Sequence, residues 1–196
     1  PPPHSVAVLP FVNLSGNKEQ EYFSDGLTEE LLNSLAAIDE LQVAARTSAF
    51  SFKGKDNDIG TIARKLNVGA VLEGSVRRSA HTIRITAQLI NAVTGFHLWS
   101  KTYDRNVGDV LKLQSEIATS VASALKVTLL GNVAEKIELG GTRNPDAFDA
   151  YLRGLKLARI AAATTPMECQ APIHAFDEAI ALDSTFALAY ANRALI

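Results

Sequence analysis

Residues 82–89 alternate between apolar and polar side chains with a strict period of two. The apolar set is Ile83, Ile85, Ala87 and Leu89, and the polar set is Thr82, Arg84, Thr86 and Gln88. This period is that of a β-strand with one buried face and one solvated face. Strand patterns at 70–78 and 97–104 flank it, separated from it only by turn residues. Such short loops make consecutive strands antiparallel neighbours, so the sequence predicts a meander.

The remaining N-terminal patterns predict an α/β (α+β) fold. An apolar run at 6–12, broken by Pro10, and alternating residues from 41 to 52 predict two more strands, the second with an irregular continuation. Apolar residues at helical spacing predict helices at 23–38, 59–66 and 110–129. We therefore expect a mixed five-stranded sheet with packed helices.

The chain changes character after a stretch rich in glycine. Gly131, Gly140, Gly141 and Pro145 punctuate it, and beyond them only helical patterns remain, at 146–161, at 166–182 and in a third segment running to Ile196. The sequence predicts an α/β domain over 5–130, a linker over 131–145 and an all-α helical hairpin region over 146–196.

The charge balance excludes binding that depends on a concentrated basic surface. The 19 Lys and Arg residues oppose 21 Asp and Glu residues, for a net charge of −2. We therefore expect no nucleic-acid partner, no membrane insertion and a cytoplasmic location. The single Cys169 cannot form a disulfide within the chain, and four scattered histidines do not resemble a zinc site.

Motifs that would support catalysis are missing from the sequence. Its glycines never form GxGxxG or GxxxxGK[ST], and no Gly-x-Ser-x-Gly elbow occurs. We expect no catalytic residue, no cofactor and no metal ion.

Several charged residues remain candidates for contact with a ligand or partner. Asp25 is either the N-terminal cap of the first helix or a carboxylate that faces a ligand. Glu73 lies inside an apolar strand, where a carboxylate needs a partner, and Arg46 or Arg84 could form that ion pair. Arg77 could join Arg84 at a phosphate, although a solvated sheet face is the more common explanation for such residues.

Trp99 is the aromatic candidate for a pocket lining. Aromatic residues on strands are more often part of the core. Both interpretations of Trp99 stay open at this point.

Four segments resemble the TolB-like N-terminal domain that accompanies bacterial adenylate or guanylate cyclases and CadC-type regulators. They are 6–15 (VAVLPFVNLS), 22–31 (YFSDGLTEEL), 71–78 (VLEGSVRR) and 98–105 (LWSKTYDR). The resemblance covers about two-thirds of the chain and implies a mixed α/β domain without catalytic activity.

The C-terminal region resembles tetratricopeptide repeats, which pair two helices and stack into a solenoid. The residues that carry this resemblance, and that would pack the repeat, are Tyr151, Gly154, Phe176, Ala179 and Tyr190. Ser184 departs from the pattern, because proline usually stands there. Since about three repeats are needed for stability, we expect the natural protein to continue beyond Ile196.

Together the two resemblances imply a regulatory, protein-interaction module of a bacterial signalling protein. They imply the C-terminal part of a class III adenylate or guanylate cyclase that couples partner or ligand binding to cyclic-nucleotide output. The expected partner is a protein or peptide on the tetratricopeptide surface, with a homodimer formed through an edge strand. The alternatives are the same module in a winged-helix transcriptional regulator and a small-molecule receptor with its pocket between the sheet and the first long helix.

Overall fold

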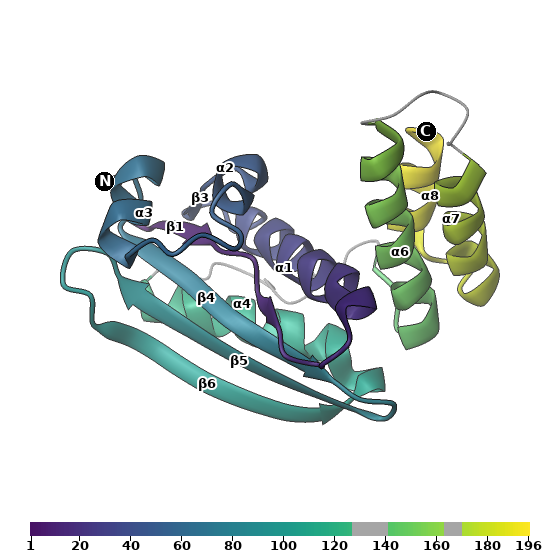
Figure 1. Cartoon of the computed structure of the whole chain (residues 1–196), viewed down its shortest axis with the longest axis horizontal. Helices are drawn as coiled ribbons and strands as arrows, with labels where there is room; N and C mark the ends of the chain where they lie inside the picture. The colour runs from purple at the N-terminus through teal and green to yellow at the C-terminus, as the bar shows by residue number, and fades with distance from the viewer. Residues whose placement is uncertain (127–140, 163–169) are drawn as a thin grey trace.

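The computed structural model describes residues 1–126, 141–162 and 170–196. A mixed α/β part is followed by three helices that pack beside it (Figure 1). The strands are β1 (Ser5–Val8), β2 (Val12–Asn13), β3 (Gln42–Val43), β4 (Ala70–Arg78), β5 (Thr82–Asn91) and β6 (His97–Asn106). The helices are α1 (Glu21–Ala36), α2 (Arg46–Phe50), α3 (Ile59–Leu66), α4 (Val110–Ala124), α6 (Pro145–Ala162), α7 (Gln170–Leu182) and α8 (Ala187–Ala194), with short 3₁₀ turns before α1 and α4.

The sheet has the order β3-β1-β4-β5-β6, and β2 adds a short pairing to β4. The pairs of β1 with β3 and β4 are parallel, and those of β5 with β4 and β6 are antiparallel. The predicted mixed sheet and meander are confirmed. The sheet has six strands because the single strand expected at 6–12 is divided in two.

Pro10 explains that division. It has no N–H to donate, so the ladder to β4 cannot run through it. Leu9 N donates to Leu72 O at 2.9 Å, and the next such bond to β4 is from Leu14 N to Val76 O at 2.7 Å. Between them, Phe11 N donates to Thr28 Oγ1 of α1 at 3.0 Å. The chain therefore leaves the sheet over these residues and is anchored to a helix.

Helices cover the two faces of the sheet unequally. α1 and α4 pack on one face, where Leu72, Ile85 and Leu89 belong to the large buried cluster. α3 covers only the beginning of β4 on the opposite face, through a small cluster that includes Ala63 and Val71. The rest of that face is open to solvent, which agrees with the alternation along β5.

The segment after β3 departs from the prediction. Ala49 to Phe52 were expected to continue a strand, but α2 begins at Arg46 instead. Ala49 N donates to Ala45 O at 3.0 Å, which is a helical bond, and Ala49 is fully buried. The guanidinium of Arg46 lies 4.0 Å from the centre of the Phe50 ring, a contact that the helical turn permits. Alternation over so few residues did not distinguish a strand from one helical turn.

Helices α6 and α7 pack closely through a glycine. A Cβ atom on Gly154 would lie 2.6 Å from the ring of Phe176, which is fully buried. The ring of Tyr151 contacts two other rings. Its centroid lies 5.9 Å from that of Phe176 and 4.9 Å from that of Phe186. Ala179 is buried as well, whereas Tyr190 on α8 is about half exposed.

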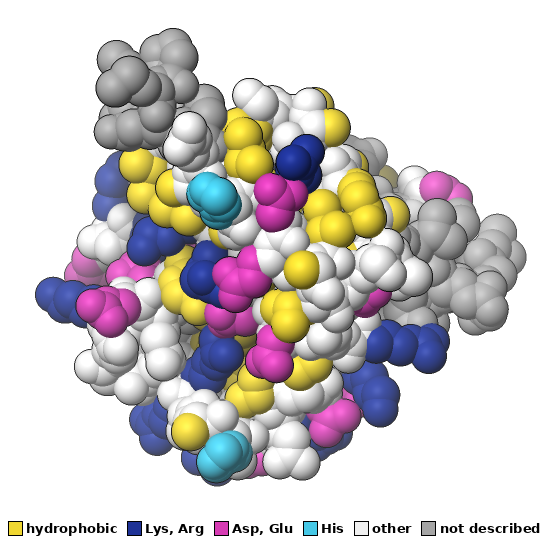
Figure 2. Space-filling model, turned by 90° about the vertical axis from the view of Figure 1, so that its right-hand side faces the viewer, with side chains coloured by type: hydrophobic (Ala, Val, Ile, Leu, Met, Phe, Trp, Pro, Cys, Tyr) yellow, Lys and Arg dark blue, Asp and Glu magenta, His cyan; other side chains and the backbone are white. Residues whose placement is uncertain are grey.

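The side of the molecule that carries α6 to α8 has a mixed surface. Figure 2 shows hydrophobic side chains there in separate groups, with acidic and basic residues between them. Exposed apolar residues of these helices include Ile160, Leu182 and Tyr190.

Some predictions concern residues outside the described ranges. These are the end of the helix expected at 110–129, most of the linker at 131–145, the beginning of the helix expected at 166–182, and Cys169. The division into domains at this linker stays a prediction.

Gly154→Ala should destabilise the protein by about 1–3 kcal/mol, because the new methyl group overlaps the Phe176 ring. In an ordinary helix interior the same change would stabilise by about 1 kcal/mol, so the sign of the effect is diagnostic. Urea denaturation measures it. Gly108→Ala is the matched control, since its nearest neighbour is Pro145 Cγ at 4.0 Å. Equal stability of the two variants would contradict the close packing of α6 on α7.

Candidate functional site

The first candidate site is the contact between α1 and α6, which we call the junction. Gly26 of α1 makes this contact close, because a Cβ there would lie 2.7 Å from Leu152 Cδ2 of α6. Phe148, Tyr151 and Leu152 of α6 belong to the same buried cluster as Phe23 and Leu27 of α1. The junction is therefore continuous with the core.

Asp149 of α6 is the centre of a polar network at one end of the junction. Its Oδ1 accepts from Tyr22 Oη at 2.9 Å and lies 2.5 Å from Arg78 Nη1, while Arg153 Nε lies 3.3 Å from Oδ2. The Arg78 guanidinium also lies 4.4 Å from the centre of the Phe23 ring. Burial, followed by the Asp149 charge, raises the pKa of Tyr22 to about 12. The phenol therefore stays protonated and donates at neutral pH.

Glu29 of α1 forms a second ionic contact. Its Oε2 lies 3.1 Å from Arg46 Nε and 2.6 Å from Arg159 Nη1 of α6. One carboxylate thus joins α1, α2 and α6. Burial lowers the pKa of Arg46, and the Glu29 charge opposes that shift.

Glu30, the next residue, has a different environment. It is 9% exposed, and its Oε1 accepts a hydrogen bond from Tyr151 Oη at 3.2 Å. Burial raises the pKa of Glu30 to about 7, with the Tyr151 hydrogen bond acting in the opposite direction. Burial also raises the pKa of Tyr151, and the Glu30 charge adds to it. A carboxyl group at the junction therefore titrates near neutral pH.

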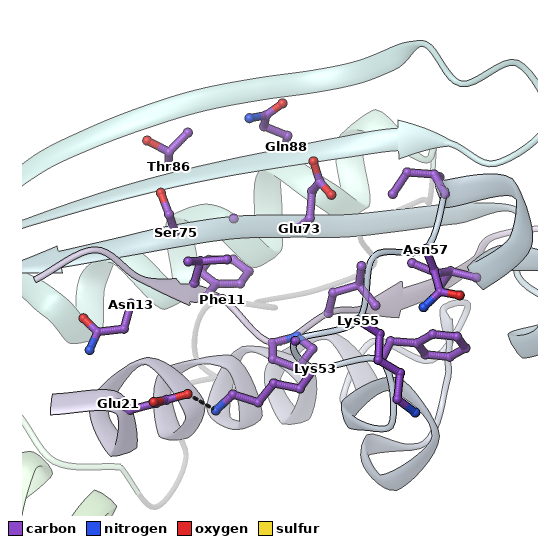
Figure 3. Close-up of a pocket in the computed structure, with 18 of the residues that line it drawn as sticks. Phe11, Asn13, Glu21, Lys53, Lys55, Asn57, Glu73, Ser75, Thr86 and Gln88 are labelled. Carbon is purple, nitrogen blue, oxygen red and sulfur yellow. Dashed lines mark ion pairs between the residues drawn. The ribbon is translucent and has the colours of Figure 1, made fainter. Parts of the chain in front are cut away.

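The second candidate site is a groove of about 730 Å³ on the open face of the sheet (Figure 3). Glu73, Ser75, Thr86 and Gln88 of β4 and β5 form its floor, and Phe11 lies beside them. Lys53, Lys55 and Asn57 come from the loop after α2. Leu9, Pro10 and Phe11, where the chain leaves the ladder to β4, also line the groove.

Asp25 is not a helix cap, and it contacts Lys53, which lines this groove. α1 begins at Glu21, after Gln20, so Asp25 lies within the first turns of the helix. Lys53 Nζ lies 2.7 Å from Asp25 Oδ1 and 2.6 Å from Glu21 Oε1. The Lys53 hydrogen bond and charge lower the pKa of Glu21.

The proposed ion pairs of Glu73 are wrong. Arg46 contacts Glu29, and Arg84 Nε lies 2.6 Å from Asp104 Oδ1. Both arginines therefore have other carboxylate partners, and Glu73 makes no ion pair within the described ranges. Its half-buried carboxylate lines the groove instead.

The arginines of β4 point to opposite faces. Arg77 is directly opposite Arg84 on the exposed side of the sheet, whereas Arg78 reaches the junction. Trp99 packs partly buried against the large core cluster. Of the predicted contact residues, Glu73 lines the groove, whereas Asp25, Arg46, Arg77, Arg84 and Trp99 do not. The apolar side chains of α1 pack within the large core cluster, and Glu21 at the start of α1 lines the groove.

Tyr22, Glu29, Glu30 and Asp149 were not predicted as site residues. Each lies on a helix that was predicted from the spacing of its apolar residues, and these four side chains were not considered further. The available signal was their position on the helix, since acidic and aromatic residues beside an apolar stripe can contact a neighbouring element.

Metal-binding clusters and membrane-spanning helices are both absent from the residues that the structure describes. Within residues 1–126, 141–162 and 170–196, no group of three or more His, Cys, Asp or Glu side chains could hold a metal ion. None of the helices described there is both long enough and apolar enough to cross a membrane.

Comparison with known proteins finds one strong relative. No protein-family model matches the chain. A protein of Rhizobium meliloti (strain 1021) named "Putative adenylate cyclase 3" is 40% identical over 201 residues, which cover 100% of this chain and 34% of the relative. The chain thus spans about a third of the length of the curated relative that it matches.

Solved structures give weaker likenesses. TolB from Acinetobacter baumannii matches with a TM-score of 0.46 and 12% identity, over 62% of this chain and 28% of TolB. Lipoprotein GNA1162 from Neisseria meningitidis matches with a TM-score of 0.44 and 20% identity, over 61% of this chain and 97% of the lipoprotein. These TM-scores are low, and the fold described above rests on the strand order and packing of this chain alone.

Asp149→Asn should lower the free energy of unfolding by about 1–2 kcal/mol, because it weakens charge-assisted bonds to Arg78 and Arg153 that are partly shielded from water. Asp104→Asn is the matched control, since its ion pair with Arg84 is exposed and should contribute nothing measurable. Chemical denaturation compares the two variants. Similar losses in both would argue against a stabilising junction network.

Glu30→Gln should change the pH dependence of stability. The folded pKa of Glu30 is about 7, above its ordinary value of 4.5, so folding favours the protonated acid. This contribution is complete below pH 4.5 and is lost as the pH rises toward 7. The variant keeps an acceptor for Tyr151 and carries no charge. Relative to wild type it should therefore gain up to about 3 kcal/mol between these two limits.

The measurement is the unfolding free energy of both proteins across this pH range. Glu116→Gln is a control, because Glu116 lies on the exposed side of α4 and contacts Arg105 at 3.7 Å. A stability difference between Glu30→Gln and wild type that does not vary with pH would contradict the assignment.

Proposed function

We propose that this chain is a non-catalytic regulatory module of a bacterial signalling protein and forms part of a class III adenylate cyclase. In this proposal, a ligand or protein partner binds to the module and alters the production of a cyclic nucleotide by another domain. The TolB-like and tetratricopeptide-like segments would bind that ligand or partner.

The single observation that carries the proposal is the match to the Rhizobium protein. Its 40% identity extends over the whole chain, so it includes the α/β part and the helices together. The remaining two-thirds of that protein leaves room for a separate catalytic domain. The name of the relative favours a cyclase over the winged-helix regulator, which no observation on this chain favours.

The junction supports a role in transmitting a signal. Asp149, Glu29 and Glu30 each take part in a contact that joins α6 to the α/β part. A binding event that displaced α6 would have to break these contacts together, since they lie along one pair of helices. The state of one part would then depend on the state of the other.

The helices α6 to α8 would provide the surface for a protein or peptide partner. We propose that they begin a tetratricopeptide array, on the basis of the close contact of Gly154 with Phe176 and the buried Ala179. Helical arrays of this kind bind peptides on their concave side. A homodimer through the edge strand β6 is a further proposal, because β6 has a neighbour on one side only.

The test uses the full-length protein that contains this chain. Cyclic-nucleotide formation from ATP and from GTP would be measured for the full-length protein, for a form lacking residues 1–196, and for the isolated chain. We expect the isolated chain to be inactive, and we expect its deletion to change the rate of the full-length protein. Full-length Asp104→Asn controls for a surface change, and full-length Asp149→Asn tests the junction.

Three results would contradict the proposal. Product formation by the isolated chain would overturn its non-catalytic role. A full-length protein without cyclase activity would overturn the cyclase assignment. Equal rates with and without residues 1–196 would overturn the regulatory role.

A further inference from the structure

A cavity of about 560 Å³ borders the junction. We call it the junction cavity. Its described lining comes from α1, α4, α6 and α8 and includes Glu30, Gln114, Phe148, Phe186 and Leu188. The volume is in the range that holds small organic ligands. Residues of the α/β part and of the C-terminal helices therefore line one partly open cavity.

Gln114 has an unusual position in this cavity. It lies on α4, is 7% exposed, and its Nε2 has no hydrogen-bond partner among the described residues. A buried amide donor without an acceptor is costly, and most such groups in native proteins are paired. Gln114 lines the cavity although its Nε2 is almost fully buried, so a bound molecule with a suitable acceptor would reach this donor once the amide group turns toward the cavity.

Glu30 supplies the complementary group. Its carboxyl group is buried on α1 and accepts one hydrogen bond from Tyr151, which leaves further lone pairs for a donor in the cavity. Phe148 and Phe186 are buried and form apolar walls together with Leu188. The cavity therefore combines a free donor, an acceptor and apolar surface.

We propose that the junction cavity binds a small neutral molecule with a carboxamide or lactam group on an apolar body. The carbonyl oxygen of the ligand would accept from Gln114 Nε2, and its N–H would donate to Glu30. The Phe148, Phe186 and Leu188 side chains would receive the apolar body. An anionic ligand fits less well, because its charge would lie beside the Glu30 carboxyl group.

Such a ligand would contact both partners of the junction and would favour the conformation in which they are packed together. That regulatory consequence rests on the proposed function, whereas binding itself does not. The binding test therefore uses the purified 196-residue chain and does not involve cyclase activity.

The probe is benzamide, titrated into the isotope-labelled chain and followed by nuclear magnetic resonance. We expect saturable shifts of the Gln114 side-chain amide and of residues around the cavity. Acetophenone, which keeps the carbonyl and lacks the N–H, should bind more weakly. Gln114→Leu should weaken benzamide binding roughly tenfold, because it removes the donor and preserves the size of the side chain.

Gln88→Leu is the matched control, because Gln88 lines the groove on the sheet and not the junction cavity. It should leave benzamide binding unchanged. If Gln114→Leu does not fold, Glu30→Met provides a second variant that should also weaken binding.

The proposal is overturned if benzamide causes no saturable shifts up to its solubility limit. It is also overturned if binding is equal in the wild type and in the folded cavity variant, or if only Gln88→Leu reduces binding. In each case the full-length cyclase assay could still succeed, so failure of this proposal and failure of the proposed function are distinguishable.

Discussion

Helix α1 is buried on two sides, and the rest of the structure depends on this double burial. One side, with Phe23, Leu27 and Leu31, packs within the core that faces the sheet. The other side approaches α6, where Gly26 allows Leu152 to pack against the α1 backbone. A surface helix normally has one apolar stripe and one solvated side. Because α1 has two packed sides, it joins the α/β part to the C-terminal helices.

The polar groups of the junction follow from this arrangement. Adjacent residues of a helix point in different directions, so Glu29 and Glu30 meet different surroundings. Glu29 lies between Arg46 and Arg159, whose positive charges compensate for its partial burial. Glu30 is more deeply buried and has a tyrosine in place of a cation, and burial therefore raises its pKa. The junction combines a fixed ionic contact with a group that titrates near neutral pH.

Much of the fold was predictable from the sequence, because its patterns are local. The period of two along β5 and the short turns around it predict the meander, and α3 spans 59–66 as its apolar spacing indicated. The helix α2 was missed because Ala49 to Phe52 is too short to separate a strand from a helical turn. The site was less predictable. Asp25 resembled a cap because it is a cap-forming residue beside the first apolar positions of the helix, whereas α1 begins earlier, at Glu21. The partners of Arg46 and Arg84 depend on long-range packing that no local pattern encodes.

The most direct test of the account is native-state hydrogen exchange of the isolated chain at increasing concentrations of urea. If α1 joins the two parts into one cooperative unit, amides of α6 and α7 should exchange through the same opening as those of β4 and β5, with the same free energy. Exchange of α6 and α7 at a much lower free energy, with β4 and β5 still protected, would contradict it. The C-terminal helices would then be an independent unit that merely contacts α1.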